Sequence, residues 1–169
     1  MSPEKRGTGD VAVEAARRVL GDGAAISEPR KLAGGAMHDS WAVDGTVDGS
    51  SRELVVRVSP AGRADYEKTR REFEVLKVAF GRGVRCPPPI DVGQFESGED
   101  YLVMSRVRGE SNPRQLVTSD QYAGARKRLI AQLAEDLARI HQISPDDVAA
   151  APNMRGPAPG EDPLVYHRR

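Results

Sequence analysis

Apolar residues recur along this chain at two spacings, which divide it into predicted helices and strands. Residues 10–20 repeat alanine, valine and leucine at helical intervals, with Asp10 able to cap the start and Gly21 able to end the segment. Residues 65–81 carry a second apolar stripe at the same period, and residues 119–143 carry the longest one. These three segments are predicted to be helices.

Between the first two helices the period changes to two. Residues 30–33, 40–45 and 53–58 alternate apolar and polar positions around glycine-rich turns, which predicts an antiparallel meander. After a proline stop, residues 90–94 and 101–107 read as two further strands. We therefore expect an α+β fold with an antiparallel sheet of about five strands and one helix packed across it.

The strand at 53–58 contains one charge among valines. Side chains alternate across a strand, so Leu54, Val56 and Val58 share the face that looks like core. Val55 and Arg57 share the other face. A guanidinium beside a branched apolar residue suits a solvated surface or the roof of a ligand site.

Composition narrows the function classes. The 169 residues hold 25 basic and 25 acidic side chains, with a pI near 6.8, so we expect no nucleic-acid partner. Cys86 is the single cysteine, which excludes an intrachain disulfide and a cysteine-built metal site and fits a cytoplasmic location. Because the chain has neither a secretory signal nor an apolar run of membrane-spanning length, we expect no membrane partner.

The order of elements resembles the small lobe of protein-kinase-like enzymes, and the sequence is most similar to aminoglycoside phosphotransferase-like small-molecule kinases. The resemblance covers about residues 32–143. LAGGAMHDSWAVD resembles the family's glycine-bearing first hairpin, LVVRV its third strand, and RREFEVLKVAFGRGVRCPPPIDVG its helix and following proline turn. YLVMSRVRGES resembles its hinge, and LAEDLARIHQI the helix that usually precedes the catalytic loop.

The resemblance implies four regions. Residues 1–29 form a flexible lead with a helix, and residues 30–107 form a kinase-like nucleotide-binding N-lobe. Residues 108–143 form the hinge exit and the first helix of an incomplete C-lobe, and residues 144–169 form a truncated tail rich in proline and glycine.

The resemblance also gives the strand arginine a role. In this family the third strand carries a basic residue that grips the ATP phosphates, with a small apolar residue two positions earlier against the adenine. Arg57 and Val55 hold those positions, although the family prefers lysine at the first. Glu72 matches the helix carboxylate that steadies the basic side chain, the alternative being an ordinary surface glutamate.

Two backbone segments complete the implied ATP site. In the first hairpin, which opens at Leu32, Gly34 and Gly35 let backbone N–H groups approach phosphates, unless they form only a tight turn. His38 and Ser40 in the same loop could donate hydrogen bonds to phosphate, or the histidine is merely solvated.

In the hinge, Met104 would pack against the adenine. The C=O of Ser105 and the N–H of Val107 would then pair with the purine edge. The alternative is a simple edge strand whose methionine fills core space.

The catalytic elements of the family have no counterpart here. A phosphotransferase of this class needs a catalytic aspartate and Mg²⁺ ligands in a His-Gly-Asp-type loop, and neither His38, His141 nor His167 begins one. The resemblance therefore implies the nucleotide-binding part of an ATP-dependent kinase for a small-molecule hydroxyl, inactive alone, with Mg²⁺ binding dependent on a C-lobe. A truncated gene product, one piece of a split enzyme and a non-enzymatic interaction module remain open.

The long helix implies a partner. Its apolar stripe over residues 129–140 should lie exposed without a C-lobe, and would favour a complementing C-lobe chain or self-association. The residues of this stripe are Leu129, Ile130, Leu133, Leu137 and Ile140.

Overall fold

The computed structural model describes residues 6–33, 38–149 and 151. Within this part of the chain six strands form one antiparallel sheet in the order β1-β3-β4-β6-β5, with β2 also paired to β3. The strands are β1 (Ala25–Ile26), β2 (Arg30–Lys31), β3 (Asp39–Val47), β4 (Ser50–Ser59), β5 (Pro89–Gln94) and β6 (Asp100–Ser105). The expected α+β class and antiparallel meander are confirmed. The two-residue strand β1 is too short to leave a periodic signal in the sequence.

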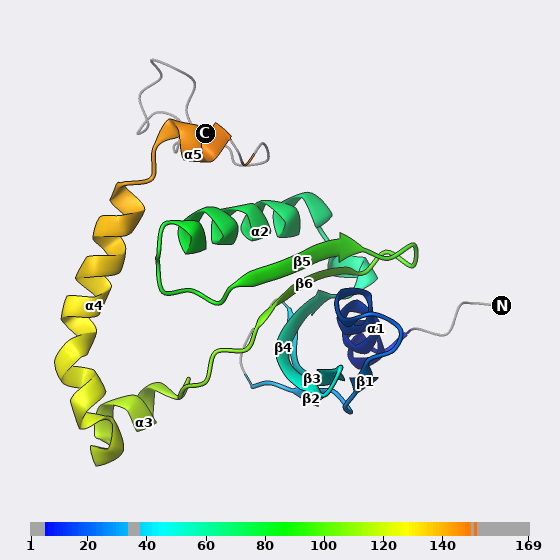
Figure 1. The fold of residues 1–169 in the computed structure, drawn as a ribbon, viewed down its shortest axis with the longest axis horizontal. Coiled ribbons are helices and arrows are strands. Elements are labelled where there is room, and N and C mark those ends of the chain that lie inside the picture. The colour runs from blue at the N-terminus through cyan, green and yellow to red at the C-terminus, as the bar shows by residue number, and fades with distance from the viewer. Residues whose placement is uncertain (1–5, 34–37, 150, 152–169) are drawn as a thin grey trace.

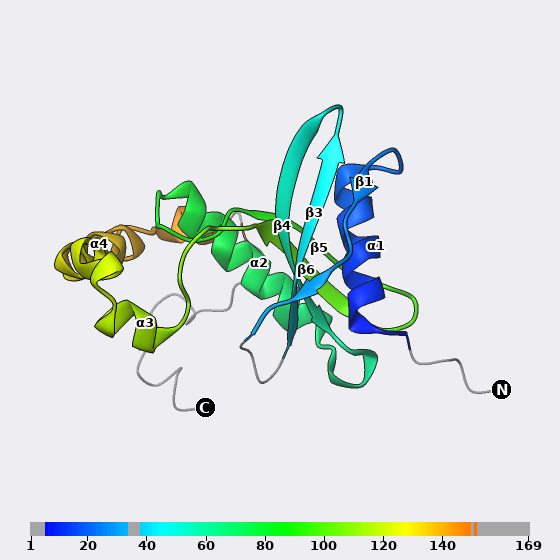
Figure 2. The ribbon, with the colours of Figure 1, turned by 90° about the horizontal axis from the view of Figure 1, so that it is seen from below.

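Two long helices cover opposite faces of this sheet (Figures 1 and 2). They are α1 (Thr8–Leu20) and α2 (Tyr66–Gly81). The sequence predicted one helix across the sheet, so α1 is a second cover that the prediction lacked. Helix α1 covers the face of β4 that carries Leu54, Val56 and Val58, because these apolar side chains need an apolar layer above them.

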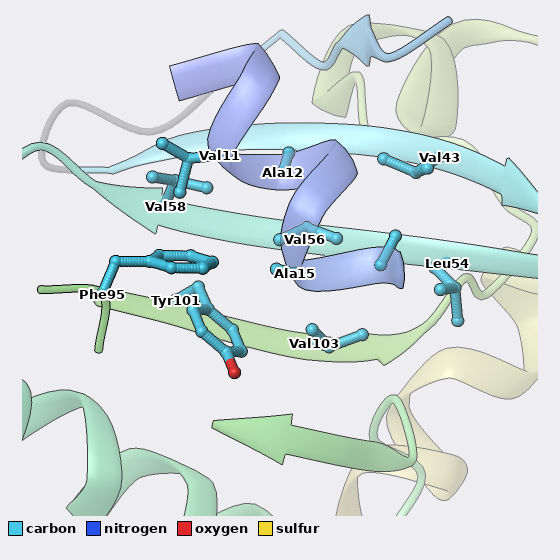
Figure 3. Close-up of a cluster of buried hydrophobic side chains, with 11 residues drawn as sticks. Val11, Ala12, Ala15, Val43, Leu54, Val56, Val58, Phe95, Tyr101 and Val103 are labelled. Carbon is cyan, nitrogen blue, oxygen red and sulfur yellow. The ribbon is translucent and has the colours of Figure 1, made fainter. Parts of the chain in front are cut away.

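The core lies between α1 and the sheet. Alanines on α1 bring the helix backbone close to the strands, and the side chains from β3, β4 and β6 fill the space beneath (Figure 3). The buried cluster consists of Val11, Ala12, Ala15, Ala16, Val43, Leu54, Val56, Val58, Phe95, Tyr101 and Val103. The prediction that Leu54, Val56 and Val58 face the core is therefore correct. The opposite face of β4 is left for α2 and for a candidate site.

The predicted helix over 119–143 begins later and is preceded by a separate short one. Asn112 caps α3 (Pro113–Thr118) by accepting the N–H groups of Arg114 and Gln115, and Pro113 suits the first helical turn. A 3₁₀ turn, η2 (Asp120–Tyr122), then leads into α4 (Ala123–His141). A second 3₁₀ turn, η1 (Ala61–Arg63), precedes α2.

Helix α4 lies away from the sheet (Figures 1 and 2). Arg85, after α2, forms ion pairs with Glu135 and Asp136 on α4. Arg82 pairs with Asp147 on the short helix α5 (Pro145–Ala149). Polar contacts thus hold these helices beside α2, while the apolar stripe of α4 stays exposed, as expected.

Candidate functional site

An apolar row crosses the sheet on the face away from α1. Val55 of β4 lies opposite Ala42 of β3 and opposite Met104 of β6. Because side chains that are paired across antiparallel strands point to the same face, the three form a continuous apolar strip. Ala42 is buried, whereas Val55 and Met104 are half-buried. This strip contains two of the residues assigned to adenine contact.

Arg57 lies two residues along β4 on the same face. Its guanidinium forms an ion pair and hydrogen bond with the carboxylate of Glu72 on α2. The two side chains are 24 % and 36 % exposed, so the pair is partly shielded from water. Burial lowers the pKa of Arg57, and the nearby carboxylate of Asp100 opposes that shift. The pairing of Arg57 with Glu72 is confirmed, and neither residue is a lone surface charge.

Asp100 and Asp65 fix the start of α2, a feature that sequence reasoning missed. Asp100 begins β6 and is fully buried, and its Oδ2 accepts the main-chain N–H of Asp65 with an N···O distance of 2.8 Å. Asp65 is the N-cap of α2 and accepts the N–H of Lys68 through its own side chain. The aspartate before the helix was a usable capping signal, whereas nothing in the strand pattern marked Asp100.

His38 lies beside this anchor. Its Nδ1 is 2.8 Å from Oγ of the buried Ser59, at the end of β4. Burial lowers the pKa of His38, the charges of Arg57 and Lys68 act in the same direction, and Asp100 opposes them. The histidine is therefore a half-buried, hydrogen-bonded residue rather than a solvated one.

The strand β6 ends at the predicted hinge. The N–H of Ser105 donates to the C=O of Pro88 at 2.9 Å, whereas the N–H of Arg106 donates to the C=O of Glu53 at 2.9 Å. These two amides point to opposite sides of the chain, as in an extended strand. Val107 follows, with 63 % of its surface exposed.

An ionic cluster holds the hinge against the β3–β4 hairpin. Arg106 and Arg108 both form ion pairs with Glu53 at the start of β4. Arg108, followed by Arg106, holds the pKa of Glu53 below its usual range. Sequence reasoning missed this cluster, because charged residues in a loop and a strand carry no periodic signal.

The first hairpin is described only in part. The N–H of Leu32 donates to the C=O of Ser40 at 2.8 Å, which closes the two sides of the hairpin. Gly34 and Gly35, assigned to phosphate contact, lie outside the described residues.

A cavity of about 420 Å³ opens between β4 and α2. Its lining consists of Arg57, Lys68, Arg71, Glu72, Val75 and Leu76. The ion pair between Arg57 and Glu72 therefore borders this cavity.

No group of three or more histidine, cysteine, aspartate or glutamate side chains in the described part of the chain could hold a metal ion. No helix found there is both long and apolar enough to cross a membrane.

Comparisons with known proteins agree with this fold. One solved structure, the GDP complex of wild-type aminoglycoside 2'-phosphotransferase-IIIa, aligns with a TM-score of 0.58 and 19% sequence identity. The alignment covers 94% of this chain and 47% of that chain, so this chain spans about half the length of that protein. The likeness shows a shared kinase-like partial fold. A search of curated proteins gave no match.

A family model settles the relationship. The model described as the phosphotransferase enzyme family matches residues 28–165, which include the whole sheet from β2 onward, the Arg57–Glu72 pair and the hinge. This chain belongs to the phosphotransferase enzyme family.

Proposed function

We propose that this chain provides the nucleotide-binding lobe of a kinase that transfers a phosphoryl group from ATP to a hydroxyl of a small molecule. The observation that carries the proposal is the Arg57–Glu72 ion pair, which joins β4 to α2 beside the apolar strip. A partly shielded cation held by a carboxylate next to an apolar surface suits a ligand with one flat apolar end and one anionic end. A nucleotide has both.

Each part of the site has a chemical role in this proposal. Val55 and Met104 contact the two-ring base, and the fork of Arg57 binds oxygens of the α- and β-phosphates. Glu72 orients that fork and neutralises it before nucleotide arrives. Leu32, Gly34 and Gly35 form the hairpin that covers the phosphates, with backbone N–H groups as donors.

The hinge selects the base. The Arg106 amide faces Glu53 of β4 and the Ser105 amide faces Pro88. By strand alternation the C=O of Ser105 and the N–H of Val107 would then lie on the side away from β4. An acceptor from Ser105 followed by a donor from Val107 matches the amino group and ring nitrogen of adenine. Guanine presents the opposite order. We therefore propose ATP for this chain, although the related structure is a GDP complex.

Catalysis requires groups beyond this lobe. The chain spans about half of the related structure, and among the described residues no cluster of metal-ligating side chains occurs. Transfer in this class needs Mg²⁺ and a catalytic base. We propose that a second lobe supplies both, and that this chain alone binds nucleotide without transferring phosphate.

Nucleotide titration tests the proposal. ATP with Mg²⁺ added to the 169-residue chain should shift the backbone resonances of residues 32–35 and 105–107, and GTP should shift the second group less. Arg57→Ala should weaken binding by about tenfold, because it removes a charge-assisted contact. Absence of any shift at millimolar ATP would contradict the proposal.

A second candidate function comes from α4. Five large apolar side chains on one stripe of this helix are 45% to 76% exposed. A stripe of this kind is a docking surface for another protein. Because this chain covers only 47% of the related structure, we propose that the occupant is a complementing C-lobe, with self-association as the competing outcome.

A further inference from the structure

A second cavity lies on the side of the sheet that α1 covers. Its volume is about 520 Å³, and it opens between the last turn of α1, the start of β4 and the hinge. The register of β6 against β4 ends at the pair Leu54–Ser105, so β6 does not cover the first residues of β4. The cavity occupies the notch that remains where β6 leaves the sheet.

One part of this cavity is apolar. Val19 and Leu20 come from the last turn of α1, Leu54 comes from β4 and Ile90 comes from β5. Leu54 is buried, Val19 and Leu20 are half-buried, and Ile90 is 38% exposed. These side chains form an apolar wall that is partly open to solvent, against which the apolar body of a ligand can pack.

The other part carries one positive charge in excess. Its lining contains Arg52, Arg106 and a single carboxylate, that of Glu53. Arg106 and Arg108 both pair with Glu53, and Arg106 also pairs with Asp44. Three arginines therefore meet two carboxylates around this part of the cavity. Within the described residues Arg52 forms no ion pair, so its guanidinium can bind an anion.

A main-chain donor lies beside this cation. The C=O of Glu53 points toward the hinge, where it accepts the N–H of Arg106 at 2.9 Å. By strand alternation the N–H of Ser51, two residues earlier, points to the same side, beyond the last pair of β6. The α1 dipole has its negative end at Leu20, which disfavours an anion at the apolar wall. An anionic group is therefore bound best at the β4 end, beside Ser51 and Arg52.

We propose that this cavity binds a small carboxylic acid with an apolar body. The carboxylate accepts hydrogen bonds from Arg52 and from the N–H of Ser51, and the apolar body packs against the last turn of α1. A singly charged planar carboxylate suits one guanidinium fork, whereas a phosphate dianion needs a second cation, and Arg106 is already paired with carboxylates. Val55 and Met104 lie on the opposite face of the sheet, so this site is separate from the proposed nucleotide site.

Titration of the full chain with phenylacetate, phenylacetamide and phenethylamine, followed by backbone resonances, tests the inference. The compounds share an aromatic body and differ in the charge of the head group. Phenylacetate should shift residues 19–20 and 51–54 and bind about tenfold more tightly than the neutral amide, and the amine should bind least. Arg52→Gln should remove that advantage, and Arg52→Lys should restore part of it. Arg30→Gln is the matched control, since Arg30 is an exposed strand arginine outside this cavity, and thermal melts verify each fold.

The outcomes separate this inference from the proposed function. Binding of phenylacetate that depends on Arg52 supports the carboxylate site, whether or not the chain binds ATP. No shift at millimolar phenylacetate, or equal losses in Arg52→Gln and Arg30→Gln, would overturn the carboxylate site and leave the nucleotide proposal standing. If the chain binds ATP, phenylacetate should bind at the same time. Displacement of ATP by phenylacetate would put the carboxylate in the nucleotide site and overturn this inference.

Discussion

The buried carboxylate of Asp100 accepts the main-chain N–H of Asp65 at 2.8 Å, and this contact ties the first residue of β6 to the N-cap of α2. Glu72 lies two turns further along the same helix, where it meets Arg57. The position of α2 along the sheet therefore depends on Asp100 at one end and on Arg57 near the middle. The side of the sheet that faces α2 is organised by these two polar contacts.

Asp100→Ala should lower the free energy of unfolding by about 2 kcal/mol, because it leaves the N–H of Asp65 without its buried acceptor. Asp100→Asn keeps an acceptor oxygen and should cost less. Denaturant unfolding measures both. Glu96→Ala is the control, since Glu96 is exposed on the same hairpin, and it should stay within about 0.5 kcal/mol. Equal costs for Asp100→Ala and the control would contradict the anchoring role.

The Arg57–Glu72 pair should show energetic coupling. Glu72→Ala should cost about 1 kcal/mol, near the low end for a buried pair, because the Glu72 side chain is 36 % exposed and water screens it. The double variant with Arg57→Ala should recover part of that loss, since it no longer leaves a shielded guanidinium unpaired. Denaturant midpoints of the four proteins in the cycle measure the coupling.

Glu67→Ala serves as the control for that cycle, because Glu67 is an exposed carboxylate on the same helix. It should change the unfolding free energy by less than about 0.5 kcal/mol. Its effect and that of Arg57→Ala should be additive in the double variant. Simple additivity of Arg57→Ala and Glu72→Ala would mean that the pair contributes no coupling.

Much of the fold was predictable from local patterns. The period-two segments predicted β2 to β4, the segments after the proline stop predicted β5 and β6, and the helical stripes predicted α1 and α2. The pairing of Arg57 with Glu72 came from the resemblance to kinase-like enzymes, and strand alternation and helical spacing were compatible with it. The helical stripe did not place α1 on the sheet, because an amphipathic pattern does not specify the surface that the helix covers.

The contacts that escaped prediction are polar and distant in sequence. Asp100 and Asp65 are 35 residues apart, and the hinge arginines pair with Glu53 more than 50 residues earlier. Charged side chains have no period that reveals such partners. The long helix was predicted from 119, but Asp120–Tyr122 form a 3₁₀ turn and α4 begins at Ala123. The short helix α3 before it, which Asn112 and Pro113 begin, was not predicted.

Gly93 on β5 should not tolerate a side chain. A Cβ there would lie 2.4 Å from the hydroxyl oxygen of Tyr101, whose ring is buried in the core and whose hydroxyl donates to Asp91 at 3.1 Å. Gly93→Ala should lower the unfolding free energy by about 1–3 kcal/mol, because a rigid ring must move. Gly62→Ala, where no heavy atom lies within 4 Å, is the matched control for thermal melts. Similar melting temperatures for both variants would contradict this prediction.

The apolar stripe of α4 should drive association. Ile130 is 76% exposed and Leu133 is 56% exposed, and the double change Ile130→Glu/Leu133→Glu should abolish self-association and the binding of a hydrophobic dye. Ala138→Glu is the control, because helical spacing puts Ala138 on the opposite side of α4. Light scattering of the three proteins gives the readout. A wild-type chain that is monomeric and binds no dye would count against a docking surface.

His38 should make stability depend on pH. Its folded-state pKa lies below the ordinary value of 6.5, chiefly because of burial, so the unfolded chain binds the proton more readily than the folded chain does. The free energy of unfolding should therefore fall as the pH drops through about 6.5, and it should level off below the pKa of the folded state. Above neutrality His38 is neutral in both states and should not lower the stability. His38→Gln should flatten this slope in urea unfolding between about pH 7.5 and about pH 5.5, roughly one unit either side of the ordinary imidazole pKa. The His38 ring signals should titrate with a midpoint below 6.5. An unchanged slope in His38→Gln would mean that the histidine is not responsible.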